Sequence, residues 1–160
     1  MLTAKGKYGL KALMHLGSVP PGKTVLAVDI AEANNIPKKF LDAILGELRN
    51  AGIVYSKKGP GGGYILARAP DEIQISQVIR TLDGPLAPIA CASRTAFHQC
   101  DDCKDVRACA VRLAMTKVRD AMAEVLDRMT VADMLRGESR SSVRYLRKGP
   151  MRSASASGRH

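Results

Sequence analysis

The residues with the clearest chemistry in this chain are its four cysteines, which lie close together in the sequence. Cys91, Cys100, Cys103 and Cys109 follow the pattern C-x8-C-x2-C-x5-C. Four thiolates on one short segment can surround a single metal centre, and thiolates match soft or borderline metals. The pattern therefore predicts a thiolate metal site, with an iron–sulfur cluster or zinc as the bound group.

The spacing leaves the nature of this site open. Structural zinc sites usually combine two C-x2–4-C pairs, whereas only Cys100 and Cys103 form such a pair here. A disulfide switch is another interpretation, in which Cys100 pairs with Cys103, while the polar segment argues against buried free thiols. Carboxylates of Asp101, Asp102 and Asp105 should raise the pKa of the thiols until a cation binds. We therefore expect the empty segment to be disordered and the filled one to be ordered.

The charge of this chain of 160 residues favours a polyanionic partner. The net charge is +10, with +6 over residues 1–70, −1 over 71–136 and +5 over 137–160. Nucleic acid is the natural partner of such a basic first half, and a solvated basic surface is the alternative. No apolar run approaches the roughly 20 residues of a membrane helix, and no signal peptide is evident. We therefore expect a cytoplasmic protein with no membrane partner.

Residues 1–84 have the pattern of a winged helix-turn-helix. Apolar residues at helical spacing predict helices over residues 3–17, 25–34, 37–51 and 75–83. A short helix, a polar turn and a longer helix that begins with Lys38 and Lys39 are typical of a DNA-binding motif. Strands are predicted over 53–55 and 64–66, on either side of a turn at 57–63.

This turn predicts a basic wing. Lys57 and Lys58 precede its glycines, which allow close backbone approach to DNA, and the lysines can meet phosphates or enter a minor groove. A nucleotide phosphate loop is disfavoured, because there the lysine follows the glycines and a helix comes next.

Beyond residue 84 the pattern changes. Residues 85–103 predict an irregular loop with a functional or ligand-ordered role, and a long helix follows from about Asp105 to residue 129. Apolar residues of this helix repeat at heptad spacing, namely Val111, Met115, Val118, Met122, Val125 and Met129. Such a seam is typical of a dimer interface, and packing on the core of its own subunit is the alternative. Thr130 and Asp133 have the spacing of a capping box before a short last helix.

Several motifs of the chain match those of one known family. The stretch LRNAGIVYSKKGPGGGYILA contains the signature LxxAGxVxSxxGxxGGY, and the opening LTAKGKYGLKALMHL, the segment ISQVIRTLDG and the clustered cysteines agree with it. Over residues 1 to about 136 the chain resembles the Rrf2 family of bacterial winged-helix regulators, which includes regulators of the IscR, NsrR and RirA type.

The resemblance implies a homodimer joined by the long helix, a DNA-contacting helix at 37–51, a wing at 57–63 and an iron–sulfur cluster, 4Fe–4S or 2Fe–2S, under the loop that precedes the long helix. Lys58 falls at the wing position that enters the minor groove in relatives. Positions that contact the operator in relatives are occupied here by Lys39, Phe40, Asp42, Ala43 and Arg49.

The cysteine segment departs from the family pattern. Relatives usually have three cysteines with five residues between neighbours, a gap that only Cys103 and Cys109 keep. Their fourth ligand is a histidine after the last cysteine or an aspartate in the first helix of the partner, and Arg112 and Lys7 stand at these places. Because Cys100 is additional, we expect ligation by four cysteines of one subunit.

These observations predict a mainly α fold with a small β-hairpin, divided into four parts. The parts are a winged helix-turn-helix domain at 1–84, a cysteine-rich loop at 85–109, a dimerisation helix with a short C-terminal helix at 105–136 and a disordered basic tail at 137–160. The expected function is a homodimeric regulator, of repressor type, that binds a two-fold symmetric double-stranded DNA operator and senses iron, redox state or nitric oxide through its cluster. A zinc-bound or thiol/disulfide regulator without a cluster is the alternative. No catalytic histidine, acid pair or cofactor loop indicates an enzyme.

Overall fold

The computed structural model describes residues 2–137, and it confirms the predicted mainly α fold with one β-hairpin. The elements are α1 (Ala4–Ser18), α2 (Ala27–Asn34), α3 (Lys38–Asn50), β1 (Val54–Lys57), β2 (Gly63–Leu66), α4 (Ile75–Asp83), α5 (Ala110–Arg128) and α6 (Val131–Leu135), with one-turn 3-10 helices η1 (Pro70–Glu72) and η2 (Ala90–Ala92). The predicted basic tail lies outside the described residues apart from Gly137. No helix within the described residues is long and apolar enough to cross a membrane.

Helices α1, α3 and α4 enclose the core of the winged domain. The apolar stripe of α3 is buried, with Leu41, Ile44, Leu45 and Leu48 at most 1% exposed. It meets Leu13 of α1 and Val78 of α4 in the same cluster of buried residues. Because this stripe fixes the rotation of α3 about its axis, the opposite face of the helix is held toward solvent.

The wing is a hairpin with a further segment bridged to it. Strands β1 and β2 are antiparallel, and Lys57 pairs with Gly63, so β1 extends two residues beyond the predicted strand. The segment before α2 adds an antiparallel bridge, because Val25 and Tyr64 exchange both backbone hydrogen bonds, at 2.7 and 2.9 Å. Thr24 Oγ1 donates to the Gly61 carbonyl at 2.7 Å, which anchors the tip of the wing.

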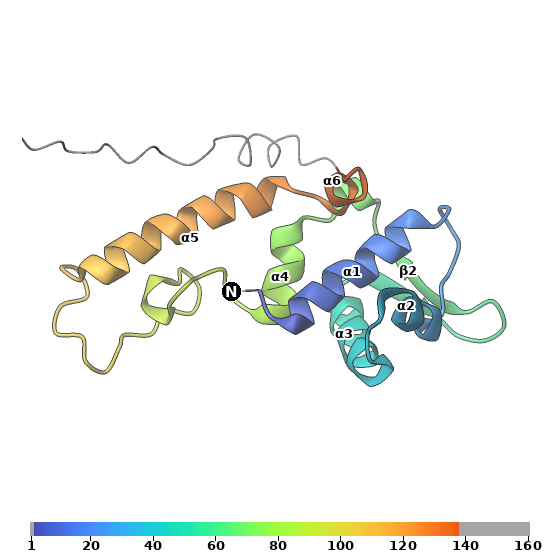
Figure 1. The fold of residues 1–160 in the computed structure, drawn as a ribbon, viewed down its shortest axis with the longest axis horizontal. Helices are drawn as coiled ribbons and strands as arrows, with labels where there is room; N and C mark the ends of the chain where they lie inside the picture. Colours follow the sequence, from blue (N-terminus) through green and yellow to red (C-terminus); the bar gives the residue numbers. More distant parts are fainter. Residues whose placement is uncertain (1, 138–160) are drawn as a thin grey trace, which may run out of the picture.

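Helix α5 begins at Ala110, later than predicted. Asp105 Oδ1 accepts a hydrogen bond from the Arg107 backbone N–H at 2.8 Å, a local turn that competes with a helix. Cys109 takes the position before the first helical residue, where its sulfur accepts from the Arg112 backbone N–H at 3.5 Å. From there α5 runs back from the far end of the molecule toward α6, on the side away from the wing (Figure 1). The predicted capping box of α6 is confirmed, with Thr130 Oγ1 accepting from the Asp133 N–H.

Gly63 offers a test of the wing. Its φ of 135° suits glycine, and an added Cβ would lie 2.5 Å from the carbonyl oxygen of Val25. We expect Gly63→Ala to lower the free energy of unfolding by about 1–3 kcal/mol in a denaturant titration. Gly46→Ala is the control, because Gly46 lies within α3 and an added Cβ meets no atom within 4 Å. The control should raise stability by about 0.5–1 kcal/mol, and equal effects of the two changes would contradict the bridge between Val25 and the wing.

Candidate functional site

The outer face of α3 presents the predicted DNA-contacting residues to solvent. All of them are exposed in the subunit, and they are Lys38, Lys39, Phe40, Asp42, Ala43 and Arg49. The buried stripe on the opposite side of the helix is what turns them outward. The geometry therefore offers a surface that carries both charge and an aromatic ring, and a protruding helix of this kind suits a major groove.

Two contacts on this face shape it further. Lys38 Nζ lies 2.8 Å from Asp42 Oδ2, in an exposed pair one helical turn apart. An exposed pair of this kind contributes little free energy, so Lys38 can readily exchange the carboxylate for a phosphate. Phe40 is 54% exposed and packs edge-on against Tyr8 of α1, with ring centroids 6.4 Å apart. This contact holds the Phe40 ring in place at the start of α3.

The wing lysines lie at one edge of the hairpin. Lys57 is the last residue of β1 rather than the first residue of the turn, and Lys58 lies in the turn itself. Both side chains are exposed. The backbone at Gly59 and Gly61 has φ values of 85° and 70°, so the tip adopts a conformation that side chains disfavour.

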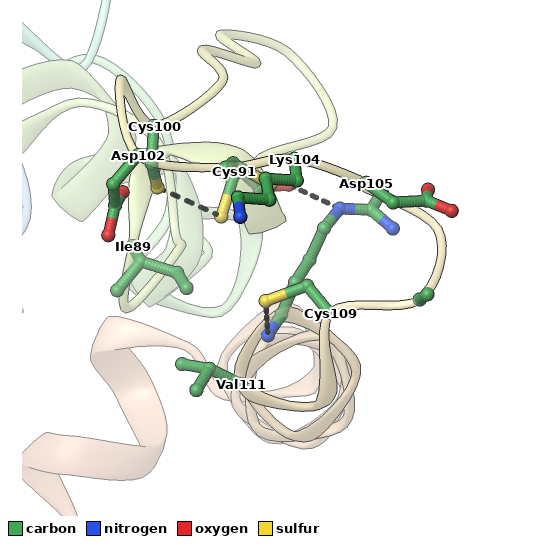
Figure 2. A pocket seen from close by; sticks show the side chains of 11 residues that line it. Ile89, Cys91, Cys100, Asp102, Lys104, Asp105, Cys109 and Val111 are labelled. Atoms are coloured by element: carbon green, nitrogen blue, oxygen red, sulfur yellow. Dashed lines mark hydrogen bonds between the residues drawn. The ribbon is translucent and has the colours of Figure 1, made fainter.

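The four cysteines line one pocket of about 460 Å³ between the loop and the start of α5. The sulfurs of Cys91 and Cys100 lie 3.9 Å apart and point toward one another, and Cys109 lies at the first turn of α5 (Figure 2). Cys91 is buried, which corrects the expectation that the segment is too polar to bury a thiol. Cys100 is exposed, and Cys103 and Cys109 are partly buried.

The pocket does not bring three ligands to a single point. Within residues 2–137, no group of three or more His, Cys, Asp or Glu side chains lies close enough to hold one metal ion. His98 is exposed and is not part of the pocket lining. Asp102 stands beside Cys100, whereas the carboxylate of Asp105 points away from the sulfurs (Figure 2).

The environment of the loop disfavours thiolates in the absence of a cation. The hydrogen bond to Cys91 raises the pKa of the Cys100 thiol, and the charge of Cys91 adds to this effect. Desolvation raises the pKa of the Cys103 thiol, followed by the charges of Cys109 and Cys91. The carboxylates of Asp102 and Asp105 raise the pKa of Cys103 less than these, in the direction expected from the sequence.

Two arginines of α5 hold the loop against the helix. Arg112 Nε donates to the Cys91 carbonyl at 2.8 Å, and Arg119 Nη1 donates to the carbonyl of Ala92. The Arg119 side chain is only 11% exposed, and the Arg112 guanidinium lies 5.9 Å from the centre of the Phe97 ring. The loop is therefore fixed to α5 by charge-assisted bonds to its backbone, next to the buried thiol.

The valine stripe of α5 lies about 100° around the helix from Arg112 and Arg119. Its first member, Val111, also lines the cysteine pocket. No residue of α5 is buried, and Val111, Val118 and Val125 of the seam are 63%, 42% and 58% exposed. The valines of the seam therefore do not pack on the core of their own subunit, whereas Met115 and Met122 are partly buried within it. Leu126 and Met129, at the end of α5, do pack against the core.

Comparison with known proteins identifies the family. A family model named Rrf2, and described as an iron-dependent transcriptional regulator, matches residues 2–137. The chain belongs to the Rrf2 family. An rrf2-like HTH-type transcriptional regulator of Rhodobacter capsulatus is 42% identical to it over 138 residues, which are 84% of this chain and 92% of the relative.

Solved structures of Rrf2-type regulators share the fold. The structure of CymR, the global cysteine regulator of B. subtilis, is 32% identical in sequence with a TM-score of 0.70, and the match covers 87% of this chain and 98% of CymR. The structure of T. potens IscR is 30% identical with a TM-score of 0.68, over 88% of this chain and 90% of IscR. The Rhodobacter relative is named as a transcriptional regulator and CymR as a global cysteine regulator, and neither name is that of an enzyme.

For this Rrf2 protein the sequence predicted the residues of α3 that the structure exposes and the cysteines that line one pocket, but it missed the arginines. From the sequence, Arg112 was noted only because it occupies the position of a ligand histidine in relatives. Arg119 was given no role. The available signal was the seven-residue separation of the two arginines, which places both on one side of α5, about 100° around the helix from the valines.

Arg119→Met tests the attachment of the loop. The variant keeps an unbranched apolar stem and removes the donor to Ala92, so the free energy of local opening at η2 should fall by about 1.5–3 kcal/mol. Amide hydrogen exchange of residues 90–93 measures this change. Arg128→Met is the control, because Arg128 is 80% exposed and pairs with Glu124 at 3.3 Å. Equal exchange in the two variants would show that Arg119 does not hold the loop.

Proposed function

We propose that this protein is a homodimeric transcription regulator that binds a two-fold symmetric DNA operator and senses iron, redox state or nitric oxide through an iron–sulfur cluster. The cluster ligands would be Cys91, Cys100, Cys103 and Cys109. The observation that carries the proposal is that all four thiols line one pocket at the end of α5. The iron-dependent description of the family supports the same metal.

The arrangement of the sulfurs favours a cluster over a single ion. Zinc bound by four thiolates at about 2.3 Å needs sulfurs roughly 3.8 Å apart, in all pairs. The sulfurs of Cys91 and Cys100 lie at this separation, 3.9 Å apart, but within the described residues no three ligands converge on one point. An iron–sulfur cluster binds its cysteines through different iron atoms, so its ligands stand further apart around a larger volume. A pocket of about 460 Å³ lined by four thiols suits such a group.

The chain's own residues would make the site responsive. When bound, the cluster would supply a redox-active iron centre that iron limitation, nitric oxide or oxidants can alter. Cys91 and Cys109 connect the pocket to η2 and to the first turn of α5, respectively. Arg112 spans the two, since its backbone N–H donates to the Cys109 sulfur and its side chain to the Cys91 carbonyl. Oxidation of the thiols or loss of the bound group would therefore alter the contacts of the first turns of α5.

The exposed apolar face of α5 supports the homodimer. Its valines repeat at heptad spacing and lie open to solvent over most of the helix. An exposed row of apolar side chains of this kind is typical of a protein interface, and a heptad seam suits a second copy of the same helix. Two copies of α3 and the wing would then meet half-sites about 34 Å apart.

Metal analysis of the anaerobically purified protein is the direct test. We expect visible absorption with iron and acid-labile sulfide, and loss of this absorption in Cys91→Ala, Cys103→Ala and Cys109→Ala. Cys100→Ala should shorten the lifetime of the cluster in air, and Cys100→Ser should hold it weakly. His98→Ala is the control and should keep the spectrum, because His98 lies outside the pocket lining.

Three outcomes would contradict parts of this proposal. A colourless protein with bound zinc would favour the zinc-bound alternative, and a colourless metal-free protein would favour the thiol/disulfide alternative. A Cys100→Ala protein with full iron content, unchanged spectrum and unchanged lifetime would exclude ligation by four thiolates.

The wing lysines should act through phosphate charge. Lys57→Ala with Lys58→Ala should weaken operator binding and reduce the slope of log affinity against log salt by about 0.9 for each phosphate that is no longer neutralised. Fluorescence anisotropy at several salt concentrations measures both quantities. Lys117→Ala removes one exposed charge from α5 and should leave the slope unchanged. If the double variant keeps the wild-type slope, the wing lysines do not contact phosphates in the DNA complex.

The heptad seam should hold the dimer. Val118→Glu with Met122→Glu would place four like charges along a two-fold interface, at a cost of several kcal/mol in total, so the variant should be monomeric by light scattering and lose operator binding. Lys117→Glu, which lies outside the seam, should remain dimeric. A dimeric double variant would place the interface on another surface.

A further inference from the structure

The two cysteines that touch differ sharply in their access to solvent. Cys91 is 4% exposed and Cys100 is exposed, and their sulfurs lie 3.9 Å apart with both side chains directed at each other (Figure 2). The sequence suggested Cys103 as the partner of Cys100, because the two form a C-x2-C pair. The structure instead brings Cys100 to the thiol of Cys91, which is more distant in the sequence.

We propose that Cys91 and Cys100 are a modification site, at which a hydroperoxide converts the metal-free protein to a Cys91–Cys100 disulfide. The proposal rests on the proposed function in one respect, namely that a cluster and the disulfide would compete for the same two sulfurs. Formation of the disulfide itself requires no metal.

The difference in exposure between the two thiols determines which of them reacts first with the hydroperoxide. The hydrogen bond to Cys91 raises the pKa of the Cys100 thiol, but of the two thiols Cys100 is the one that a hydroperoxide in solvent can reach. Once this thiol has lost its proton, its sulfur attacks one oxygen of the hydroperoxide, and the O–O bond breaks to leave a sulfenic acid on Cys100 and an alcohol, or water when the oxidant is hydrogen peroxide. The buried Cys91 sulfur then attacks the sulfenic sulfur, the S–S bond forms and water leaves. In total the two thiols lose two electrons and two protons, and the hydroperoxide gains them.

Formation of the disulfide requires only a small movement, and this movement is made by Cys100. A disulfide needs sulfurs about 2.05 Å apart, so they must approach by roughly 1.9 Å. Cys91 is fixed, because its carbonyl is held by Arg112 and the next carbonyl by Arg119. Residues 94–100 are exposed, so Cys100 can make the approach.

The disulfide would give the metal-free protein a second, locked state. It would join the exposed segment to η2, which the arginines already fix to α5. It would also remove two of the four thiols that line the pocket. The oxidised protein should therefore be unable to accept iron until a thiol reductant restores Cys91 and Cys100.

Peptide mapping of the oxidised metal-free protein tests this pairing. The protein is stripped with chelator and reductant, checked for iron and zinc, and treated anaerobically with about one equivalent of hydrogen peroxide. We expect a mass loss of about 2 Da, two thiols that still react with iodoacetamide, and a linkage between the tryptic peptides 81–94 and 95–104.

Matched serine variants separate the possible partners, because Cys100 and Cys103 share one tryptic peptide. The linkage should persist in Cys103→Ser and Cys109→Ser and be lost in Cys100→Ser. A linkage that survives in Cys100→Ser, or oxidation within peptide 95–104 that leaves Cys91 alkylated, would overturn the proposal.

Iron uptake then distinguishes this proposal from the proposed function. The oxidised wild-type protein should take up no iron and sulfide, and uptake should return after reduction. A protein that forms the mapped disulfide but binds no iron after reduction would refute the cluster and leave the modification site standing. A protein that takes up iron but shows no linkage would refute the modification site and leave the cluster proposal standing.

Discussion

The hydrogen bonds from Arg112 and Arg119 to the backbone of η2 are the interactions on which the arrangement of the cysteine pocket depends. They reach carbonyl oxygens that lie 21 and 27 residues away in the sequence. A loop of this length with little secondary structure has many conformations, and without long-range bonds it would not keep a thiol buried. Because the donors are guanidinium groups, each bond is stronger than one between neutral groups.

These bonds also determine which side of α5 is covered by its own subunit and which side stays exposed. The face with Arg112 and Arg119 is occupied by the loop, and at the other end of the helix Arg80 of α4 pairs with Asp127 at 2.9 Å. The valine face is left over, and it is too apolar to be an ordinary solvated surface. The same helix thus carries a polar attachment to its own subunit and an apolar surface for another molecule, which in our proposal is a second copy of the chain.

The sequence predicted those features that depend on local patterns. The stripe of α3, the glycine-rich wing and the cysteine cluster all follow from spacing within short segments, and the structure contains each of them. It did not predict features that depend on contacts between distant segments. Cys91 is buried in a segment whose backbone is held by Arg112, 21 residues further along the chain. The wing is bridged to Val25, although α2 and α3 separate Val25 from its partner Tyr64 in the sequence.

The attachment of α5 at both ends explains how a local change in the loop could reach the DNA-binding surface of the proposed dimer. At its C-terminal end the chain is fixed to the winged domain, because Ile75 donates its backbone N–H to the Met129 carbonyl and Val131 donates to Ile73, at 2.9 and 3.0 Å. At its N-terminal end the helix touches the loop through Cys109 and the arginines. A helix fixed at one end and held at the other changes its direction when the second contact is altered. Since the proposed interface runs along this helix, a small rotation of α5 against its own domain would occur in both subunits of the proposed dimer, and it would change the separation of the two α3 helices.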